Sequence, residues 1–341
     1  MDSPKPFPIL RLPFLAIEKV FKAMDPFEII NFSMISKRTK GIAKQISVCP
    51  RYKIDFHIKK TLEIWFFGTR NMAAYVMTSD KEMDGKIEEK ECCGSILPVP
   101  LIFRKVFKYS KDPVDEWKQL CKYVLEIFKK HTINDLLMTM DAFVDYNVSI
   151  IDFLKANLKS VDRCTVSQWN RERYINVDEH TAYLLDNIQI NSDLCTDVYI
   201  KNINFNGKFP KNLEDLHIKN SEWIGYERLL EIDCKSVIFD NNRISDEQWN
   251  LFIKKWIAME THLNLVYLQL IYRNVEHFRA LVLHDIPHEV VDEAVKRTFK
   301  TRRNCIRELN GGIDIRRHDG KTATLFVFGI GLHGSFLMCV H

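Results

Sequence analysis

The sequence predicts a mixed α+β protein in three parts: a three-helix segment, a small antiparallel β unit, and an irregular leucine-rich-like α/β repeat domain. Three observations support this order. Apolar residues first recur at the spacing of short helices, then alternate with polar residues as in half-buried strands, and finally form strand-like and helix-like pieces in turn. We expect domains at 1–48, 49–110 and 111–341, with a β-hairpin near the end of the last one.

The composition is that of an ordinary globular chain. Of 341 residues, 46% are hydrophobic and 28% are charged, and the formal net charge is only +4. Dedicated polyanion binders carry a larger charge, so nucleic acid is not an expected partner. No stretch reaches the ~20 apolar residues of a membrane span, and we expect no signal peptide. The nine scattered cysteines favour a reducing compartment, cytoplasmic and/or nuclear, over a disulfide framework or a zinc site.

Residues 13–46 indicate three short amphipathic helices. Pro13 suits the first turn of a helix, and apolar residues follow it at helical spacing. Asp25 and Pro26 end this helix and begin the second, with Glu28 placed for a capping box. Helices this short are marginal alone. Their apolar side therefore needs a partner, either the rest of the chain or another protein.

The apolar and helix-breaking positions of this stretch form a pattern. It is made by Leu12-Pro13, Ile17, Val20-Phe21, Asp25-Pro26, Ile29-Ile30 and the segment SKRTKGIA. This pattern resembles an F-box. The resemblance implies that the segment binds the Skp-family adaptor of a cullin–RING ubiquitin ligase. The adaptor-binding residues it implies are Leu12, Pro13, Ile17, Val20, Phe21, Pro26, Ile29 and Ile30.

Two other interpretations of the first helices remain open. In one, they form a helix-turn-helix whose third helix meets DNA phosphates through Lys37, Arg38, Lys40 and Lys44. Few side chains of that helix suit the recognition of base edges, which counts against DNA binding. In the other, the helices cap a stand-alone repeat scaffold that has no role in ubiquitin ligation.

Residues 49–110 predict the small antiparallel β unit. RYKIDFHIKK alternates apolar and polar residues as a half-buried strand does, and TLEIWFFG and AAYVMTS follow as its neighbours. DKEMDGKIEEKEC contains an Asp-Gly turn and many charges, so we expect an exposed loop or hairpin there. The helical spacing of Trp117, Cys121, Val124 and Phe128 then predicts a core helix.

Strand-like and helix-like pieces alternate through the rest of the chain. The expected strands are DRCTVSQ, TDVYIKNINF, LEDLHIKNS, KSVIFDNN and LVYLQLIYR, and the expected helices are DEHTAYLLDNI, GYERLLEI, SDEQWNLFIKKWIAME and NVEHFRALVL. Three of the strands recur every ~20–30 residues, the range of leucine-rich repeats. Asp319-Gly320 lies between two alternating runs and predicts a hairpin. GSFLMCVH can add a third strand that covers the end of the array.

Four pieces of this half form a second pattern: SEWIGYERLLEI, KSVIFDNNRISDEQWNLFIKKWIAME, HLNLVYLQL and IDIRRHDGKTATL. They resemble the F-box-associated (FBA) domain that accompanies one large class of F-box proteins. The resemblance implies that this domain holds a protein substrate. The residues that we expect the array to display outward for this purpose are His217, Lys219, Tyr267 and Gln269.

No group of residues is convincing as a catalyst, and we expect no cofactor and no metal. GIGLHG at 329–334 fits a dinucleotide motif, but only seven residues follow it, so a glycine-rich turn is expected. His284 and His288 have zinc-like spacing without a third ligand nearby. Cys92 and Cys93 lack a neighbouring base.

The basic clusters RRNCIR and IRRH are expected to be solvated. Taken with the two resemblances, the sequence predicts a non-enzymatic substrate-recognition subunit of a Skp–cullin–F-box ubiquitin ligase.

Overall fold

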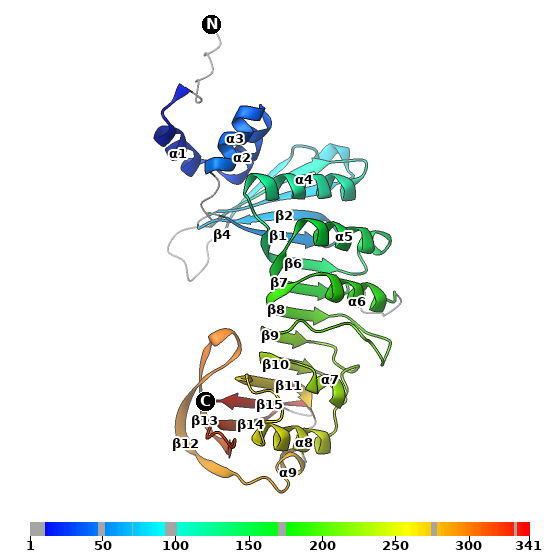
Figure 1. Cartoon of the computed structure of the whole chain (residues 1–341), viewed down its shortest axis with the longest axis vertical. Coiled ribbons are helices and arrows are strands. Elements are labelled where there is room, and N and C mark those ends of the chain that lie inside the picture. Colours follow the sequence, from blue (N-terminus) through cyan, green and yellow to red (C-terminus); the bar gives the residue numbers. More distant parts are fainter. Residues whose placement is uncertain are drawn as a thin grey trace. The chain divides into compact units, whose positions relative to one another are not determined.

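This computed structural model describes residues 11–46, 52–69, 71–92, 101–169, 175–273, 278–330 and 333–341. The chain divides into two compact units. Unit 1 comprises Met1–Leu136 and Phe153–Lys159, and unit 2 comprises Leu137–Asp152 and Ser160–His341. The expected domain boundaries near residues 48 and 110 both fall within unit 1. Three N-terminal helices are followed by strands and further helices (Figure 1), which confirms the predicted α+β class.

The elements of unit 1 follow the order that the sequence predicts. Its helices are α1 (Phe14–Ala23), α2 (Pro26–Met34), α3 (Lys37–Ile46) and α4 (Pro113–Ile127). Its strands are β1 (Lys53–Ile58), β2 (Leu62–Phe67), β3 (Asn71–Thr78), β4 (Ile87–Cys92) and β5 (Leu101–Tyr109). Two further elements, β6 (Thr132–Thr139) and α5 (Asn147–Asn157), contain residues of both units.

The predicted break between α1 and α2 is present. The Asp25 carboxylate accepts a hydrogen bond from Glu28 N at 2.8 Å, and the Glu28 carboxylate accepts one from Asp25 N at 2.8 Å. Together with Pro26 at the first helical position, this capping box fixes the start of α2. The sharp turn between the two helices is therefore specified locally.

The strands of unit 1 form a sheet in the order β1-β2-β3-β5-β4. β1 pairs antiparallel with β2, and β2 with β3, as predicted. The next pairing differs: β3 and β5 are parallel, so the unit is not purely antiparallel. The chain passes to the outer edge as β4 and returns as β5, antiparallel to β4 and next to β3. The segment 80–92, expected to be an exposed loop or hairpin, therefore supplies an exposed edge strand.

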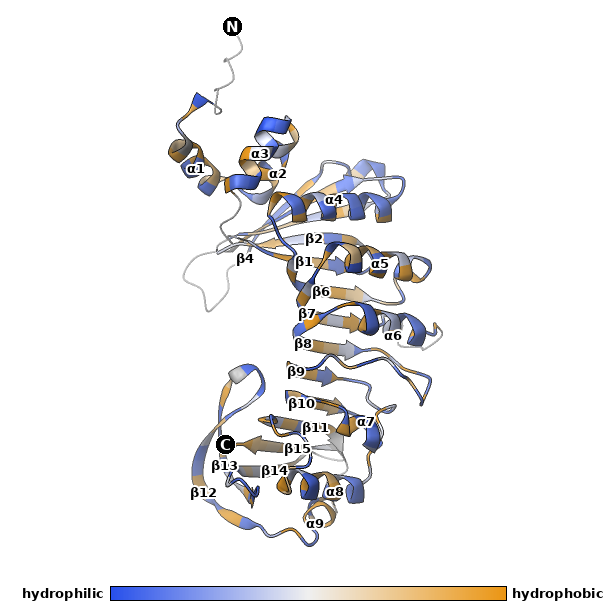
Figure 2. Ribbon diagram, viewed as in Figure 1, coloured by the Kyte–Doolittle hydropathy of each residue, from blue (hydrophilic) through white to orange (hydrophobic). Residues whose placement is uncertain are grey.

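The helix α4 directs its apolar stripe into the core of unit 1. Trp117, Cys121 and Val124 of the predicted stripe are buried, and hydrophilic residues alternate with them along the helix (Figure 2). The Trp117 ring packs edge-on against Phe56 of β1, with centroids 5.6 Å apart. The Trp117 indole N–H also donates to the backbone carbonyl of Glu63 in β2, at 3.3 Å. One side chain thus joins α4 to two strands.

The elements of unit 2 are an alternation of strands and helices followed by antiparallel strands. Its helices are α6 (Asp178–Asn187), α7 (Tyr226–Leu230), α8 (Asp246–Ile257) and α9 (Phe278–Val282). Its strands are β7 (Ser160–Ser167), β8 (Ile190–Asp197), β9 (Leu213–Ile218), β10 (Cys234–Asp240), β11 (Tyr267–Arg273), β12 (Glu289–Lys300), β13 (Ile306–Arg316), β14 (Thr322–Ile330) and β15 (His333–Val340). None of the helices that the structure describes is long and apolar enough to cross a membrane.

The strands β7 to β11 form a parallel array in sequence order. The helices α6, α7 and α8 connect three of the strand pairs and lie along one side of the array (Figure 1), as crossovers of one hand require. Buried residues at equivalent register positions form this helix face: Leu194, Leu216, Val237 and Leu268. The next residue of each strand points to the opposite face of the array: Cys195, His217, Ile238 and Gln269. A leucine-rich-like repeat stays a prediction, because parallel strands alone do not establish it.

One predicted strand of the array is displaced. The sequence predicts a strand over 196–205, but β8 spans Ile190–Asp197 and residues 198–212 contain no strand. Ile190 and Leu194 enter the core, but polar residues between them hide the apolar alternation. The apolar residues further along, Val198 to Phe205, are used in a loop instead.

Antiparallel strands close one end of the parallel array. β12 pairs with β13, β13 with β14, and β14 with β15, while β15 also pairs with β11. The hairpin predicted at Asp319-Gly320 is confirmed, since Arg316 and Thr322 face each other in β13 and β14. GIGLHG lies where β14 is followed by β15, with Gly329 opposite Gly334, and residues 331–332 lie outside the described residues. The motif joins two strands rather than a strand and a helix.

Candidate interaction surfaces

The expected adaptor-binding residues of α1 and α2 differ in exposure. Ile17, Phe21, Pro26, Ile29 and Ile30 are buried within unit 1, Leu12 and Val20 are half-buried, and Pro13 is exposed. Part of the burial comes from packing within the chain: Phe21 packs edge-on against Phe32 and Phe27 against Tyr75 of β3, with centroids 5.1 and 4.7 Å apart. Much of the apolar side of these helices is therefore covered by unit 1 itself.

Other apolar side chains of the three helices remain exposed. Leu15 is 73%, Met34 52% and Ile35 72% exposed. We call these three residues the exposed apolar group. Leu15 widens the apolar stripe of α1 in the sequence, and Met34 lies on the apolar side of α2, but spacing alone does not separate core positions from surface positions. Large apolar side chains left in water are typical of protein-binding surfaces.

Polar contacts fix the three helices on the rest of unit 1. Ser33 Oγ and the Tyr123 hydroxyl lie 2.9 Å apart, between α2 and α4. Lys40 and Lys44 of α3 bind the Glu126 carboxylate of α4 at 2.9 and 3.2 Å. These two lysines lower the pKa of the Glu126 carboxyl, chiefly through the hydrogen bond from Lys40.

A second link joins the start of α2 to the sheet of unit 1. Arg104 of β5 donates to the Asp25 carboxylate at 2.7 Å. The Tyr52 hydroxyl donates to the Met24 carbonyl at 3.2 Å. The turn between α1 and α2 is thus held by Arg104 of β5 and by Tyr52 just before β1, in addition to the contacts of α2 and α3 with α4.

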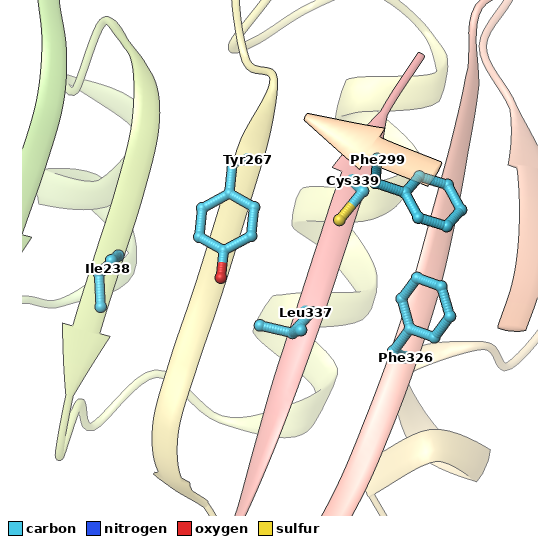
Figure 3. Close-up of a cluster of buried hydrophobic side chains, with 6 residues drawn as sticks. All are labelled: Ile238, Tyr267, Phe299, Phe326, Leu337 and Cys339. Carbon is cyan, nitrogen blue, oxygen red and sulfur yellow. The ribbon is translucent and has the colours of Figure 1, made fainter. Parts of the chain in front are cut away.

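The candidate substrate residues of unit 2 share the opposite face of the array. His217 and Gln269 occupy one register row, on either side of Ile238. Both are half-buried, whereas Lys219 is exposed and pairs with Asp197 at 3.0 Å. Tyr267 does not point into solvent as expected: it is 2% exposed. It packs in a cluster with Ile238, Phe299, Phe326, Leu337 and Cys339 (Figure 3).

His217 has charged and polar neighbours on this face. Its Nε2 lies 3.5 Å from the Asp240 carboxylate, and its register neighbour on β8 is Cys195. Burial alone would lower the pKa of His217, but the neighbouring Asp240 carboxylate and Cys195 outweigh burial and raise the pKa to about 9. The raised pKa favours the cationic form of the imidazole at neutral pH.

We expect His217 to stabilise unit 2 through its charge. Since its pKa rises from 6.5 to about 9 on folding, the contribution is complete below pH ~6.5 and is lost as the pH rises through 9. Its size is of order 1–3 kcal/mol. Proton NMR of the imidazole should show a titration midpoint near pH 9. The substitution Asp240→Asn should lower this midpoint to pH 6.5 or below. A wild-type midpoint at or below 6.5 would contradict the ion pair.

Residues of the β12–β13 hairpin reach the same opposite face, which sequence reasoning did not predict. Arg302, from the RRNCIR cluster expected to be solvated, binds the Asp215 carboxylate of β9 with Nε at 2.8 Å and Nη2 at 2.7 Å. Arg303 Nε lies 3.2 Å from the Asp193 carboxylate of β8. The sequence near Arg302 and Arg303 does not predict these ion pairs, because their acidic partners are about 90 and 110 residues away in the sequence.

The structure does not bring the described residues of the other candidate sites together. His284 is exposed beside Asp285, and His288 Nδ1 lies 2.7 Å from the Ile286 carbonyl. Within the described ranges no three His, Cys, Asp or Glu side chains are grouped so that they could hold a metal ion. Cys93 and the side chain of Cys92 lie outside what the structure describes.

Comparison with known families matches two separate parts of the chain. Residues 9–50 match the F-box domain, and residues 204–270 match a family described as F-box associated. The chain carries an F-box and an F-box-associated domain. The F-box contains α1 to α3 and the exposed apolar group. The F-box-associated match contains β9, α7, β10 and α8, and with them His217, Asp215 and Asp240.

Two proteins of Caenorhabditis elegans are similar to the chain. One is the Skn-1 dependent zygotic transcript 15 protein, which is 22% identical over 74% of this chain and 76% of its own length. The other is the E3 ubiquitin-protein ligase hecw-1, which is 21% identical over 75% of this chain but only 22% of its own length. No solved structure matches the chain significantly.

Proposed function

We propose that the protein is the substrate-recognition subunit of a Skp–cullin–F-box ubiquitin ligase. The F-box binds a Skp-family adaptor, and the F-box-associated domain binds a protein substrate. The observation that carries the proposal is the presence of both domains in one chain, at residues 9–50 and 204–270. An F-box implies adaptor binding, and this combination is typical of non-catalytic adaptor subunits.

The mechanism we propose is proximity. Holding a substrate on the same chain as the adaptor-binding F-box converts its encounter with a ubiquitin-charged enzyme into a local event with a high effective concentration. No catalytic side chain of this protein is required. The links from α2 and α3 to α4, through Ser33–Tyr123 and Lys40–Glu126, support this role because they give the F-box a defined orientation on unit 1.

The place of action that we propose is the cytosol or the nucleus. Four of the cysteines that the structure describes, Cys121, Cys164, Cys234 and Cys339, are buried as free thiols. Burial raises the pKa of Cys121, Cys234 and Cys339, which makes these thiols unreactive. Free buried thiols are compatible with a reducing compartment, where ubiquitin ligases of this class would work.

A DNA-binding role for the three helices has less support. Of the four basic residues that would meet phosphates, Lys40 and Lys44 are engaged with Glu126 of the same chain. Binding to phosphates would require them to give up this pairing. The scaffold interpretation, without a ligase role, requires no binding partner for the exposed apolar group. The experiment below distinguishes it from our proposal.

We expect the double substitution Leu15→Asp/Ile35→Asp to weaken binding of a purified Skp-family adaptor by at least about tenfold. Both side chains are exposed, so the change removes apolar contact area without disturbing the core. Calorimetric titration with the adaptor measures the affinity. Ile17 is a poorer choice for this purpose, because it is buried and an aspartate there would unfold the helix.

The matched control is Ile87→Asp, which introduces the same charge at an exposed isoleucine of β4, outside the F-box. It should bind the adaptor like the wild type. Equal affinity for all three proteins would place the adaptor surface elsewhere. No adaptor binding by the wild type would favour the scaffold, and duplex binding that weakens with salt would favour the DNA-binding role.

A further inference from the structure

The β12–β13 hairpin turns back over the opposite face of the array in unit 2. Phe299, near the end of β12, is buried against residues of β10, β11, β14 and β15 (Figure 3). Its ring packs edge-on against Phe326, with centroids 5.3 Å apart. Cys339 and Tyr267 lie in the same cluster and are buried. The hairpin therefore covers apolar side chains that the array does not cover itself.

The tip of the hairpin is fastened to the array by two ion pairs. Arg302 binds Asp215 through two nitrogens, and the carboxylate is only 1% exposed. The Ser236 hydroxyl also donates to Asp215, at 3.0 Å. Arg303, which adopts a left-handed backbone conformation with φ +54°, binds Asp193. We call these contacts of Arg302 and Arg303 the latch.

A cavity lies under the latch. Its volume is about 640 Å³, and its lining includes Asp193, Ser236, Tyr267, Thr301 and Arg303. These residues come from β8, β10 and β11 on one side and from the hairpin tip on the other. The cavity is already partly open to solvent, and release of the tip would remove the wall that Thr301 and Arg303 form.

The hairpin also contains a natural bending point. The register of β12 and β13 shifts between Val291 and Lys296. On the β13 side of this bulge, Gly311 and Gly312 adopt φ of +64° and +106°, which side chains disfavour. A bulge opposite two such glycines allows the distal part of a hairpin to change its direction relative to the proximal part.

The balance of forces favours a contact that can be released. Buried ion pairs gain little net stability, because the cost of removing two charges from water offsets their attraction. Most residues of β12 are exposed, and Phe299 is its only buried residue within the described side chains. The distal hairpin is therefore held by a few contacts and not by a broad core: Phe299 with the half-buried Leu309 beside it, the Arg297–Asp314 ion pair near its base, and the latch at its tip.

We propose that residues 296–310 form a releasable strap over the opposite face of the array, and that the latch holds it closed. Opening widens the cavity and exposes Tyr267 and Cys339 as one event, without unfolding unit 2. If the F-box-associated domain recruits a substrate as proposed above, the strap regulates which part of this domain the substrate meets. The strap itself does not depend on that function, and its test uses neither adaptor nor substrate.

The native cysteines report on the strap directly. Cys339 packs in one cluster with Phe299, whereas Cys121 is buried in α4 of unit 1, Cys164 is buried in β7, and Cys305 is exposed at the tip. Full-length protein is treated with iodoacetamide under native conditions, and the alkylation rate of each cysteine is measured by mass spectrometry. We expect Arg302→Ala/Arg303→Ala to raise the rate at Cys339 by about tenfold or more, with unchanged rates at Cys121 and Cys164.

Two further variants make the result specific. Lys296→Ala removes the exposed pair with Glu308 in the same hairpin, at 2.9 Å, and should leave the rate at Cys339 unchanged. Asp193→Asn removes the nearer carboxylate partner of Arg303, which stays 3.9 Å from Asp215, and preserves the Arg302–Asp215 pair, so the chain should stay folded and Cys339 should react a few times faster.

Either of two results would overturn the strap. One is a wild-type rate at Cys339 in both latch variants. The other is a parallel rise at Cys121, Cys164 and Cys339, which would mean global unfolding rather than local opening. Since adaptor affinity is not measured here, failure of the strap leaves the ligase proposal intact, and failure of the ligase proposal leaves the strap intact.

Discussion

Replacing Ile30 by aspartate is expected to unfold the three helices of the F-box. Ile30 is 0% exposed, and an aspartate there would place an unpaired carboxylate in an apolar site. We expect a loss of about 4 kcal/mol or more in the free energy of unfolding of this segment, because a buried unpaired charge is among the costliest substitutions. Urea unfolding followed by circular dichroism measures it, and adaptor binding should be lost as well.

The matched control is Ile35→Asp, which makes the same chemical change at an exposed position just beyond α2. Its effect on stability should stay within about 0.5 kcal/mol. Amide hydrogen exchange over residues 14–46 locates any unfolding. Similar stability of the two variants would contradict the burial of Ile30, and with it the division of the F-box into core and exposed apolar residues.

Truncating Trp117 to alanine is expected to destabilise unit 1 by about 3–5 kcal/mol. The side chain is buried between α4 and the sheet, contacts Phe56 and Phe153, and donates to the Glu63 carbonyl. The substitution removes the aromatic volume and leaves this carbonyl without its indole donor. The midpoint of urea unfolding should fall accordingly.

Trp169→Ala serves as the control for Trp117, since Trp169 is 65% exposed. Its truncation should change the free energy of unfolding by less than about 0.5 kcal/mol. Trp117→Phe should be intermediate, since it keeps ring packing but loses the N–H donor. If Trp117→Ala and Trp169→Ala lowered the free energy of unfolding equally little, the result would contradict the packing of α4 on β1 and β2.

Local signals were sufficient for much of the fold. The period of α4, the alternation in β1, the capping box at Asp25 and the Asp319-Gly320 turn all depend on residues close in sequence, and each is present in the structure. The parallel pairing of β3 with β5 was missed because it depends on where the chain returns after β4, which no local pattern encodes. β8 was misplaced because buried polar residues such as Asp193 and Thr196 interrupt its apolar pattern.

The interaction surfaces were less accessible to sequence reasoning. Resemblance to the F-box names a set of positions but does not say which of them the chain buries, so Ile17 and Pro13 appeared equivalent although one is buried and the other exposed. Tyr267, expected to face solvent, lies on the face of the array opposite the helices, but Phe299 of a distant hairpin covers it. The Arg302–Asp215 pair likewise joins residues that only the tertiary fold brings together.

The contacts that hold α2 and α3 on α4 have a mechanical consequence. Because Ser33, Lys40 and Lys44 each bind α4 by a side chain, the F-box has little rotational freedom of its own. If an adaptor binds α1 to α3 as we propose, its displacement and the displacement of the sheet of unit 1 become a single rigid-body motion. A rotation of the F-box is then transmitted in full to the sheet of unit 1.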